Sequence, residues 1–191
     1  MEIIFATNNN HKLKEIQQLL GSDFKLLSLS DVGVVEDIPE DYYTLEENAL
    51  QKARFIYQKV GKNCFADDTG LEIDGLNGEP GVLSARYAGE EKSSENNMEK
   101  VLEAMHNISD RKAQFRTVIA LILDGKEYFF EGVVKGEILY NKQGEAGFGY
   151  DPIFKPKGFN QSFAQMDIEQ KNKISHRGKA TSKLVHFLLE Q

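Results

Sequence analysis

The sequence predicts an α/β protein in which a mixed β-sheet is covered by helices. Two observations support this fold class. Strand-like and helix-like segments interleave near both ends of the chain. In the second half, residues 114–139 hold two β-rich runs on either side of Asp124-Gly125, a dipeptide favoured in two-residue hairpin turns. Interleaved elements combined with a long antiparallel hairpin are typical of a mixed sheet.

The N-terminal segment reads as strand, polar loop and helix. Residues 2–7, EIIFAT, form a short apolar run bounded by polar turn formers, which is typical of a buried strand. Between residues 13 and 20 the apolar residues recur at helical spacing, and Gly21 is a natural stop for the helix. Residues 24–30 are expected to form another strand.

Three further helices are predicted from their caps and apolar stripes. Residues 44–61 begin with a capping box of Thr44 and Glu47 and end at Gly61. A second capped helix is expected at 93–106, and a third at 175–190, where Ser175 is the expected N-cap. The strand CFAD follows the first of these helices and is expected to end at the two acids, with a turn near Gly70.

Composition limits the classes of function. A chain of 191 residues suits one domain, and residues 1–191 are taken as a single domain without a separate linker. The net charge of −7 argues against binding to a nucleic-acid backbone. A lone cysteine, Cys64, excludes an internal disulfide and fits a reducing compartment. No apolar run reaches membrane-spanning length and no signal peptide is recognised, so a cytoplasmic location without membrane partners is expected.

Asp67 and Asp68 form the first candidate site. Two carboxylates repel each other, and a divalent cation such as Mg²⁺, which prefers carboxylate, water and phosphate oxygens, relieves that repulsion. An acidic turn explains the same two residues equally well. The tripeptide DTG also surrounds the catalytic acid of aspartic proteases, but it occurs once here, so that reading would require a homodimer.

The loop TNNNHK at residues 7–12 is a candidate for phosphate binding. Backbone N–H groups at a helix N-terminus favour anions, and Lys12 adds a positive charge. The glycine spacing of a Walker loop is absent, so this is not a P-loop. An asparagine-rich helix cap is the structural alternative.

Two later motifs could contact a nucleoside. The segment GFGYDPIF at 147–154 combines glycines with Phe148 and Tyr150, either of which could stack on a flat ring, although a tight turn before a strand is the alternative. The segment SHRGKA at 175–180 places His176 and Arg177 at a helix start. Cations there oppose the helix dipole, which hints at a function, and a solvated cap is the alternative.

Five motifs occur in order along the chain: ATNNNHKLKEI, ENALQKA, FADDTGLEIDGLNGEPGVLSARYAG, GFGYDPIF and ISHRGKA. Together they resemble the inosine triphosphate pyrophosphatase family, also called the Ham1 or RdgB-like family. The motifs run from residue 6 to residue 180, so the resemblance covers nearly the whole chain. The long central motif is the most specific of the five.

The resemblance implies an Mg²⁺-dependent hydrolase, with Mn²⁺ as an alternative metal, that converts ITP, dITP and XTP to the monophosphate and pyrophosphate. It implies that Asp68 is catalytic and binds metal together with Glu40, and the adjacent Asp67 is a further metal candidate. The implied substrate-binding residues are Thr7, Asn8, Asn9, Asn10, His11, Lys12, Lys52, Thr69, Phe148, Gly149, Tyr150, Asp151, Lys171, His176 and Arg177. Asn8 stands where many members have Gly, and Thr69 where many have Ser.

The resemblance also implies a fold and an assembly. The expected fold is an elongated mixed sheet flanked by helices, with two lobes and an active-site cleft between them, and the expected assembly is a homodimer. The implied cellular role is to keep deaminated purines out of DNA and RNA. Two alternatives remain: a nucleotide-binding regulator without turnover, and a Maf-like pyrophosphatase that acts on other modified nucleotides.

Overall fold

The structure is a computed structural model that describes residues 1–21 and 23–191. The described chain divides into two compact units, each built from separate segments of sequence. The first unit comprises Met1–Asp68, Thr117–Gly132 and Arg177–Gln191, and the second comprises Thr69–Arg116 and Val133–His176. Three long strands, β3 (Cys64–Ile73), β5 (Lys112–Leu123) and β6 (Lys126–Ile138), contribute residues to both units.

The sheet is mixed, as the sequence predicts. Its strand order is β2-β1-β3-β5-β6-β7, and β4 pairs with β3 beside this path. In the first unit β1 pairs in parallel with both β2 and β3, whereas in the second unit β4 and β7 pair antiparallel with β3 and β6. The short strands are β1 (Glu2–Phe5), β2 (Lys25–Leu27), β4 (Pro80–Gly81) and β7 (Phe154–Pro156).

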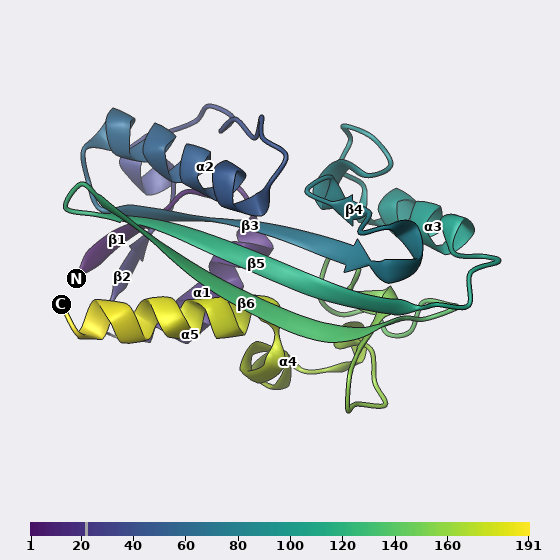
Figure 1. The fold of residues 1–191 in the computed structure, drawn as a ribbon. Helices are drawn as coiled ribbons and strands as arrows, with labels where there is room; N and C mark the ends of the chain where they lie inside the picture. Colours follow the sequence, from purple (N-terminus) through teal and green to yellow (C-terminus); the bar gives the residue numbers. More distant parts are fainter. Residues whose placement is uncertain (22) are drawn as a thin grey trace. The chain divides into compact units, whose positions relative to one another are not determined.

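Helices cover both faces of the strands in the first unit (Figure 1). Helix α2 (Leu45–Val60) lies on one face, and α1 (Asn10–Leu20) and α5 (His176–Leu189) lie on the other. The core between α1, α5 and the strands is apolar and fully buried, since it includes Ile16, Phe65 and Leu184. Burial of such side chains contributes about 1.5–3 kcal/mol each, so this core fixes the ends of α1 and α5 that carry polar residues.

The predicted caps of α1 and α2 are confirmed, whereas the role of Ser175 as the N-cap of α5 stays a prediction. Asn9 precedes α1, and its side-chain oxygen accepts hydrogen bonds from the backbone N–H groups of His11 and Lys12. Thr44 precedes α2 and accepts from the N–H of Glu47. Gly61 ends α2 with a φ of 68°, a left-handed conformation that glycine adopts without steric cost.

The predicted hairpin is also confirmed. Strand β5 turns directly into β6 through Asp124 and Gly125, whose φ angles are 49° and 78°. Positive φ at both central residues is what the favoured two-residue hairpin turns require. The turn lies in the first unit.

The second unit has its own apolar core. Helix α3 (Ser94–Ala104) is capped by Ser93, the first residue of the predicted helix, and packs Met98 and Val101 into this core with Phe115 and Phe154. Helix α4 (Ile168–Ile174) was not predicted from the sequence, because its seven residues carry apolar side chains only at the two ends. Of the residues that the structure describes, none belongs to a helix long and apolar enough to cross a membrane.

One local expectation is wrong. The sequence suggested that a strand ends at the two acids and that the chain turns near Gly70, but β3 continues to Ile73. Gly70 serves a different purpose: a β-carbon at this residue would lie 2.8 Å from the carbonyl oxygen of Gly81 in the neighbouring strand β4. The glycine therefore permits close strand packing within the second unit and does not mark a turn.

Candidate active site

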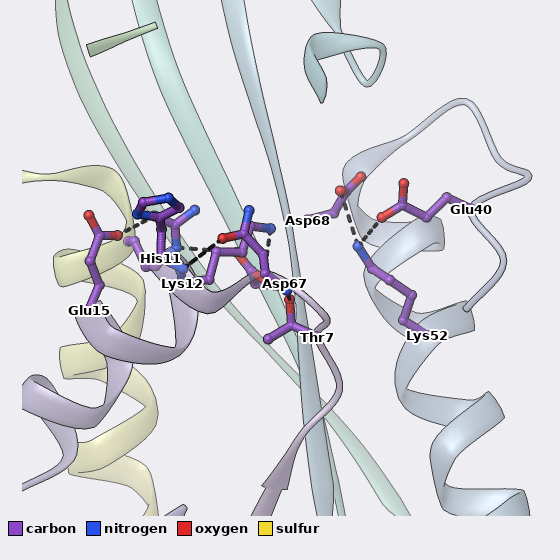
Figure 2. A network of polar contacts seen from close by, with 10 residues as sticks. Thr7, His11, Lys12, Glu15, Glu40, Lys52, Asp67 and Asp68 are labelled. Atoms are coloured by element: carbon purple, nitrogen blue, oxygen red, sulfur yellow. Dashed lines mark hydrogen bonds and ion pairs between the residues drawn. The ribbon is translucent and has the colours of Figure 1, made fainter. Parts of the chain in front are cut away.

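Asp67 and Asp68 point to opposite sides of strand β3, as Figure 2 shows. This follows from strand geometry, in which successive side chains alternate between the two faces of a sheet. Asp67 faces Lys12 on helix α1, and Asp68 faces Lys52 on helix α2. The two acids therefore belong to two different polar clusters, one on each face of the strand.

Asp67 is the centre of the first cluster. Its Oδ1 accepts a hydrogen bond from Lys12 Nζ at 2.9 Å, and its Oδ2 accepts one from Arg177 Nε at 3.3 Å. The Asp67 side chain is 1% exposed. Burial raises the pKa of this carboxyl, but the charges of Lys12, Arg177 and Lys52 outweigh burial and hold the pKa well below its usual range. Asp67 is thus an anion throughout the physiological pH range.

Arg177 is held from two sides. Besides its bond to Asp67, its Nη1 donates to Glu15 on α1, and the Arg177 side chain is 2% exposed. Burial lowers the pKa of the Arg177 guanidinium, but Asp67 and Glu15 raise it by more, so the net shift of the pKa is upward. A cation at the start of α5 opposes the helix dipole, and these two carboxylates compensate for that unfavourable placement.

The second cluster joins Lys52, Glu40 and Asp68. Lys52 Nζ lies 2.5 Å from Glu40 Oε1 and 3.3 Å from Asp68 Oδ1, and the lysine is buried (Figure 2). Burial lowers the pKa of Lys52, but the attraction of Asp68 and Glu40 outweighs it, so the pKa is raised. Lys52 therefore carries its charge within a cluster of two acids and one base.

Asp68 differs from its neighbour in its pKa. Burial raises the pKa of this carboxyl; Lys52 and Lys12 oppose that rise, Glu40 and Asp67 add to it, and the net shift is upward. Among the described residues, no group donates a hydrogen bond to Asp68 Oδ2, although this oxygen is buried. A buried acceptor without a donor is costly, so this atom is suited to a bound cation or water molecule.

The Glu40–Asp68 pair matches the ligands of a magnesium ion better than Asp67 does. No group of three or more His, Cys, Asp or Glu side chains suited to a metal is found in residues 1–21 and 23–191. Mg²⁺, however, commonly binds through one or two carboxylates together with water and substrate phosphates. Glu40 and Asp68 contact the same ammonium group, whereas both oxygens of Asp67 bind cationic side chains on the other face.

The asparagine-rich loop is a helix cap, as the structural alternative proposed. Thr7 Oγ1 accepts from the N–H of Asn9 at 3.1 Å, and Asn9 in turn caps α1. Asn8, Asn10 and His11 are exposed. The cap fixes the first turn of α1, from which Lys12 donates to Asp67, and phosphate binding by this loop stays a prediction.

In the second unit, Lys171 and Asp151 form a buried ion pair beneath Phe148. Lys171 Nζ lies 2.7 Å from Asp151 Oδ2 and 4.9 Å from the centre of the Phe148 ring. The same carboxylate accepts the backbone N–H of Phe148 at 2.9 Å, which closes the tight turn suggested by the sequence. Gly149 within this turn has a φ of 64°.

The remaining predicted contacts of the second unit differ in exposure. Tyr150 is buried and donates its hydroxyl to the carbonyl oxygen of Ser84, so Phe148, which is half-buried, is the better placed of the two aromatics for stacking on a ligand. Thr69 is also half-buried. His176 is buried and stacks on Phe115 with ring centres 4.6 Å apart.

Sequence reasoning missed several partners of the site residues. Glu15 precedes Ile16 on α1, and a charged residue beside an apolar one is ordinary in an amphipathic helix, so its burial against Arg177 has no local signal. Phe115 and Phe163 contact His176, but both read as ordinary strand or core residues in the sequence. Their role depends on tertiary packing and carries no local signal.

Comparison with known proteins places the chain in a family. A sequence model of the Ham1 family matches residues 3–187. The chain belongs to the Ham1 family. The resemblance recognised from the five motifs is therefore confirmed.

Relatives in this family include curated enzymes and solved structures. A dITP/XTP pyrophosphatase of Flavobacterium johnsoniae is 54% identical, with 98% of each chain covered, and that of Bacillus subtilis is 46% identical, with 98% of this chain and 96% of the other covered. The Ham1 protein of Coxiella burnetii matches with a TM-score of 0.92 at 41% identity, over 100% of both chains. The Staphylococcus aureus Ham1 protein gives a TM-score of 0.90 at 43% identity, over 100% of this chain and 99% of the other.

Proposed function

We propose that this Ham1-family chain hydrolyses deaminated purine nucleoside triphosphates, ITP, dITP and XTP, to the monophosphate and pyrophosphate. The observation that carries the proposal is the arrangement around β3. The buried Lys52, the half-buried Lys12, and the Asp68 carboxylate, which has one oxygen without a hydrogen bond, all lie on or beside β3 in the first unit. Relatives at about half identity over the full chain are named dITP/XTP pyrophosphatases, which supports the same activity.

The metal that we propose is Mg²⁺, with Mn²⁺ as an alternative, held by Glu40 and Asp68. The unengaged oxygen of Asp68 and the proximity of Glu40 to the same lysine fit such an ion. When bound, a divalent cation there would neutralise phosphate charge and polarise a water molecule. Asp67 is a weaker candidate, because its carboxylate already binds Lys12 and Arg177.

The other catalytic roles that we propose are charge stabilisation and general-base catalysis, both by side chains of the protein. Attack on the α-phosphorus must overcome the negative charge of the triphosphate, and Lys12 and Lys52 stabilise that charge as it moves onto the leaving pyrophosphate. Asp68, whose pKa is raised by burial, is our candidate to orient and deprotonate the attacking water. A positioned general base contributes about 10²–10⁴-fold to a rate.

Base selectivity is proposed to depend on Arg177. Hypoxanthine and xanthine carry an oxo group where adenine carries an amino group, and a guanidinium can only donate hydrogen bonds. A buried mismatch of this kind is worth up to about 10⁴–10⁵ in discrimination. In the second unit, Phe148 is our candidate for stacking on a flat ring, since Lys171 and Asp151 hold its turn in place.

The decisive experiment measures pyrophosphate release from ITP, dITP, XTP, ATP, GTP and dUTP, with and without Mg²⁺. We expect metal-dependent release from the first three and background release from ATP and GTP. Release from other modified nucleotides alone would support a Maf-like activity instead. Tight binding of ITP without release from any nucleotide would support a regulator without turnover.

Assembly and location are proposed from the family resemblance. We infer a homodimer in the cytoplasm, with a small-molecule nucleotide as the partner and no nucleic acid. The net charge of −7 supports the absence of a nucleic-acid partner, because the protein would repel a nucleic-acid backbone. Sedimentation equilibrium at micromolar concentration tests the dimer, and a mass of 21.6 kDa would contradict it.

A further inference from the structure

We propose that Asp67 is a positioning residue shared by the triphosphate-binding lysine and the base-reading arginine, and that it is not a metal ligand. The inference rests on the proposed function, because it assigns Lys12 to phosphate and Arg177 to the base. One carboxylate holds both cations: Oδ1 accepts from Lys12 and Oδ2 from Arg177. The two oxygens thus fix two cationic side chains that come from helices at opposite ends of the sequence.

Burial makes this arrangement specific. The exposed fractions of the side chains are 1% for Asp67, 2% for Arg177 and 15% for Lys12. Exposed ion pairs contribute little, but a buried pair strongly restricts where each group can lie, since separating the charges leaves one of them without compensation. We infer that Lys12 and Arg177 keep fixed positions because Asp67 lies between them.

Glu15 provides a matched comparison within the same cluster. It binds Arg177 Nη1 and is buried like Asp67, yet its contact with Arg177 comes from α1 and not from the strand. Loss of the Glu15 charge should therefore loosen Arg177 and leave the bond between Asp67 and Lys12 in place. Comparing Asp67→Asn with Glu15→Gln separates a shared role from a role at the arginine alone.

The experiment uses four binding measurements that do not require turnover. Calorimetry gives the affinities of the parent and both variants for inorganic triphosphate and for the α,β-methylene analogues of ITP and ATP, in the presence of Mg²⁺. A titration with Mg²⁺ at fixed ITP analogue gives the metal requirement. Because nothing is hydrolysed, these results remain interpretable even if the panel of nucleotides shows that the proposed activity is absent.

We expect Asp67→Asn to lower the affinity for inorganic triphosphate about 10-fold, because the released Lys12 side chain must be ordered again when the ligand binds. The preference for the ITP analogue over the ATP analogue should fall about 10-fold or more, since displacement of a group by about 1 Å can have effects of this size. The metal requirement should be unchanged. Glu15→Gln should lower the preference to a similar extent without changing triphosphate affinity.

Three results would overturn the inference. A stronger affinity of Asp67→Asn for triphosphate would mean that Asp67 only offsets the charge of Lys12. A higher Mg²⁺ requirement with retained base preference would make Asp67 a metal ligand. An unchanged base preference in Asp67→Asn would mean that Asp67 does not position Arg177 for base recognition. Circular dichroism confirms that each variant is folded.

A second variant covers the case in which Asp67→Asn does not fold. Asp67→Glu keeps the negative charge but moves the carboxylate by one methylene group. If position matters and charge alone does not, triphosphate affinity and base preference should again fall together. Parent-like values for both in Asp67→Glu would contradict a positioning role, because the charge is then sufficient.

Discussion

Asp67 and Asp68 are neighbours in the chain, yet their carboxylates have opposite pKa shifts. The pKa of Asp67 is lowered because Lys12 and Arg177 outweigh burial, whereas the pKa of Asp68 is raised by burial with help from Glu40. Alternation along a strand separates the two environments by one residue. Of these two adjacent aspartates, Asp67 therefore stays an anion and Asp68 is a candidate general base.

We expect Asp68→Asn to lower kcat for ITP about 10²–10⁴-fold, because a positioned base contributes an effect of this size. The amide keeps the shape of the side chain, so binding of the ITP analogue should be retained or strengthened. Initial-rate kinetics and calorimetry measure the two quantities. Parent-like kcat in a folded Asp68→Asn variant would remove Asp68 from the mechanism.

Cys64 should be unreactive in the folded protein. The thiol is fully buried, and burial raises its pKa from 9.0 to about 12. Because the thiolate is the reactive form, iodoacetamide at pH 8.5 should label Cys64 only after unfolding in urea. Mass spectrometry after timed labelling measures this. Fast labelling of the native chain would contradict the burial of β3.

The raised pKa of Cys64 also predicts how the stability of the protein changes at alkaline pH. The folded chain keeps the proton of Cys64 up to about pH 12, whereas the unfolded chain releases it near 9.0. The contribution of this group to the free energy of unfolding is therefore full below pH 9 and is lost as pH rises toward 12. A Cys64→Ala variant should lose less stability over this range, which urea titrations at pH 8 and pH 10.5 would measure.

At the scale of elements, local signals predicted helix starts and the hairpin but not the length of β3. Helix caps and the Asp124-Gly125 turn depend only on residues adjacent in the sequence, so they can be predicted from the sequence alone. The course of β3 depends on the close approach of Gly70 to Gly81, a contact between strands. Helix α4 was missed because its stability comes from its cap and surroundings and not from an apolar stripe.

Removal of the α2 cap should lower the stability of the protein. Thr44→Ala deletes the oxygen that accepts the N–H of Glu47, and loss of such a cap costs about 0.5–2 kcal/mol. Urea unfolding measures the change in the free energy of unfolding. Thr44→Ser is the matched control, because it keeps the hydroxyl and should remain near the parent. Equal losses in both variants would mean that the methyl group matters instead.

At the scale of the whole molecule, the net charge of −7 coexists with a local gathering of cations. An acidic protein needs its basic side chains gathered in one place to bind a phosphorylated ligand. In the first unit Lys12, Lys52 and Arg177 come from three helices and meet the acids on β3. The sequence could indicate these residues as candidates, but which acid binds which base depends on packing between helices far apart in the chain.

Unfolding should be a single transition for both units. Strands β3, β5 and β6 each continue from one unit into the other, so disorder in one part of a strand removes ladder partners along its length. Thiol labelling of Cys64 reports on the first unit, and hydrogen exchange of a peptide containing β7 reports on the second. We expect coincident urea midpoints. Two separated midpoints would show that the units unfold independently.

The three-segment composition of the first unit has a consequence for protein synthesis. Its apolar core includes Ala180, Leu184 and Leu188, which follow both segments of the second unit in the chain and so leave the ribosome after them. Until they emerge, Lys12 and Asp67 have been made but Arg177 has not joined them. The first unit cannot be completed before both segments of the second unit have been synthesised. Premature termination anywhere before α5 therefore yields a product in which Asp67 lacks Arg177.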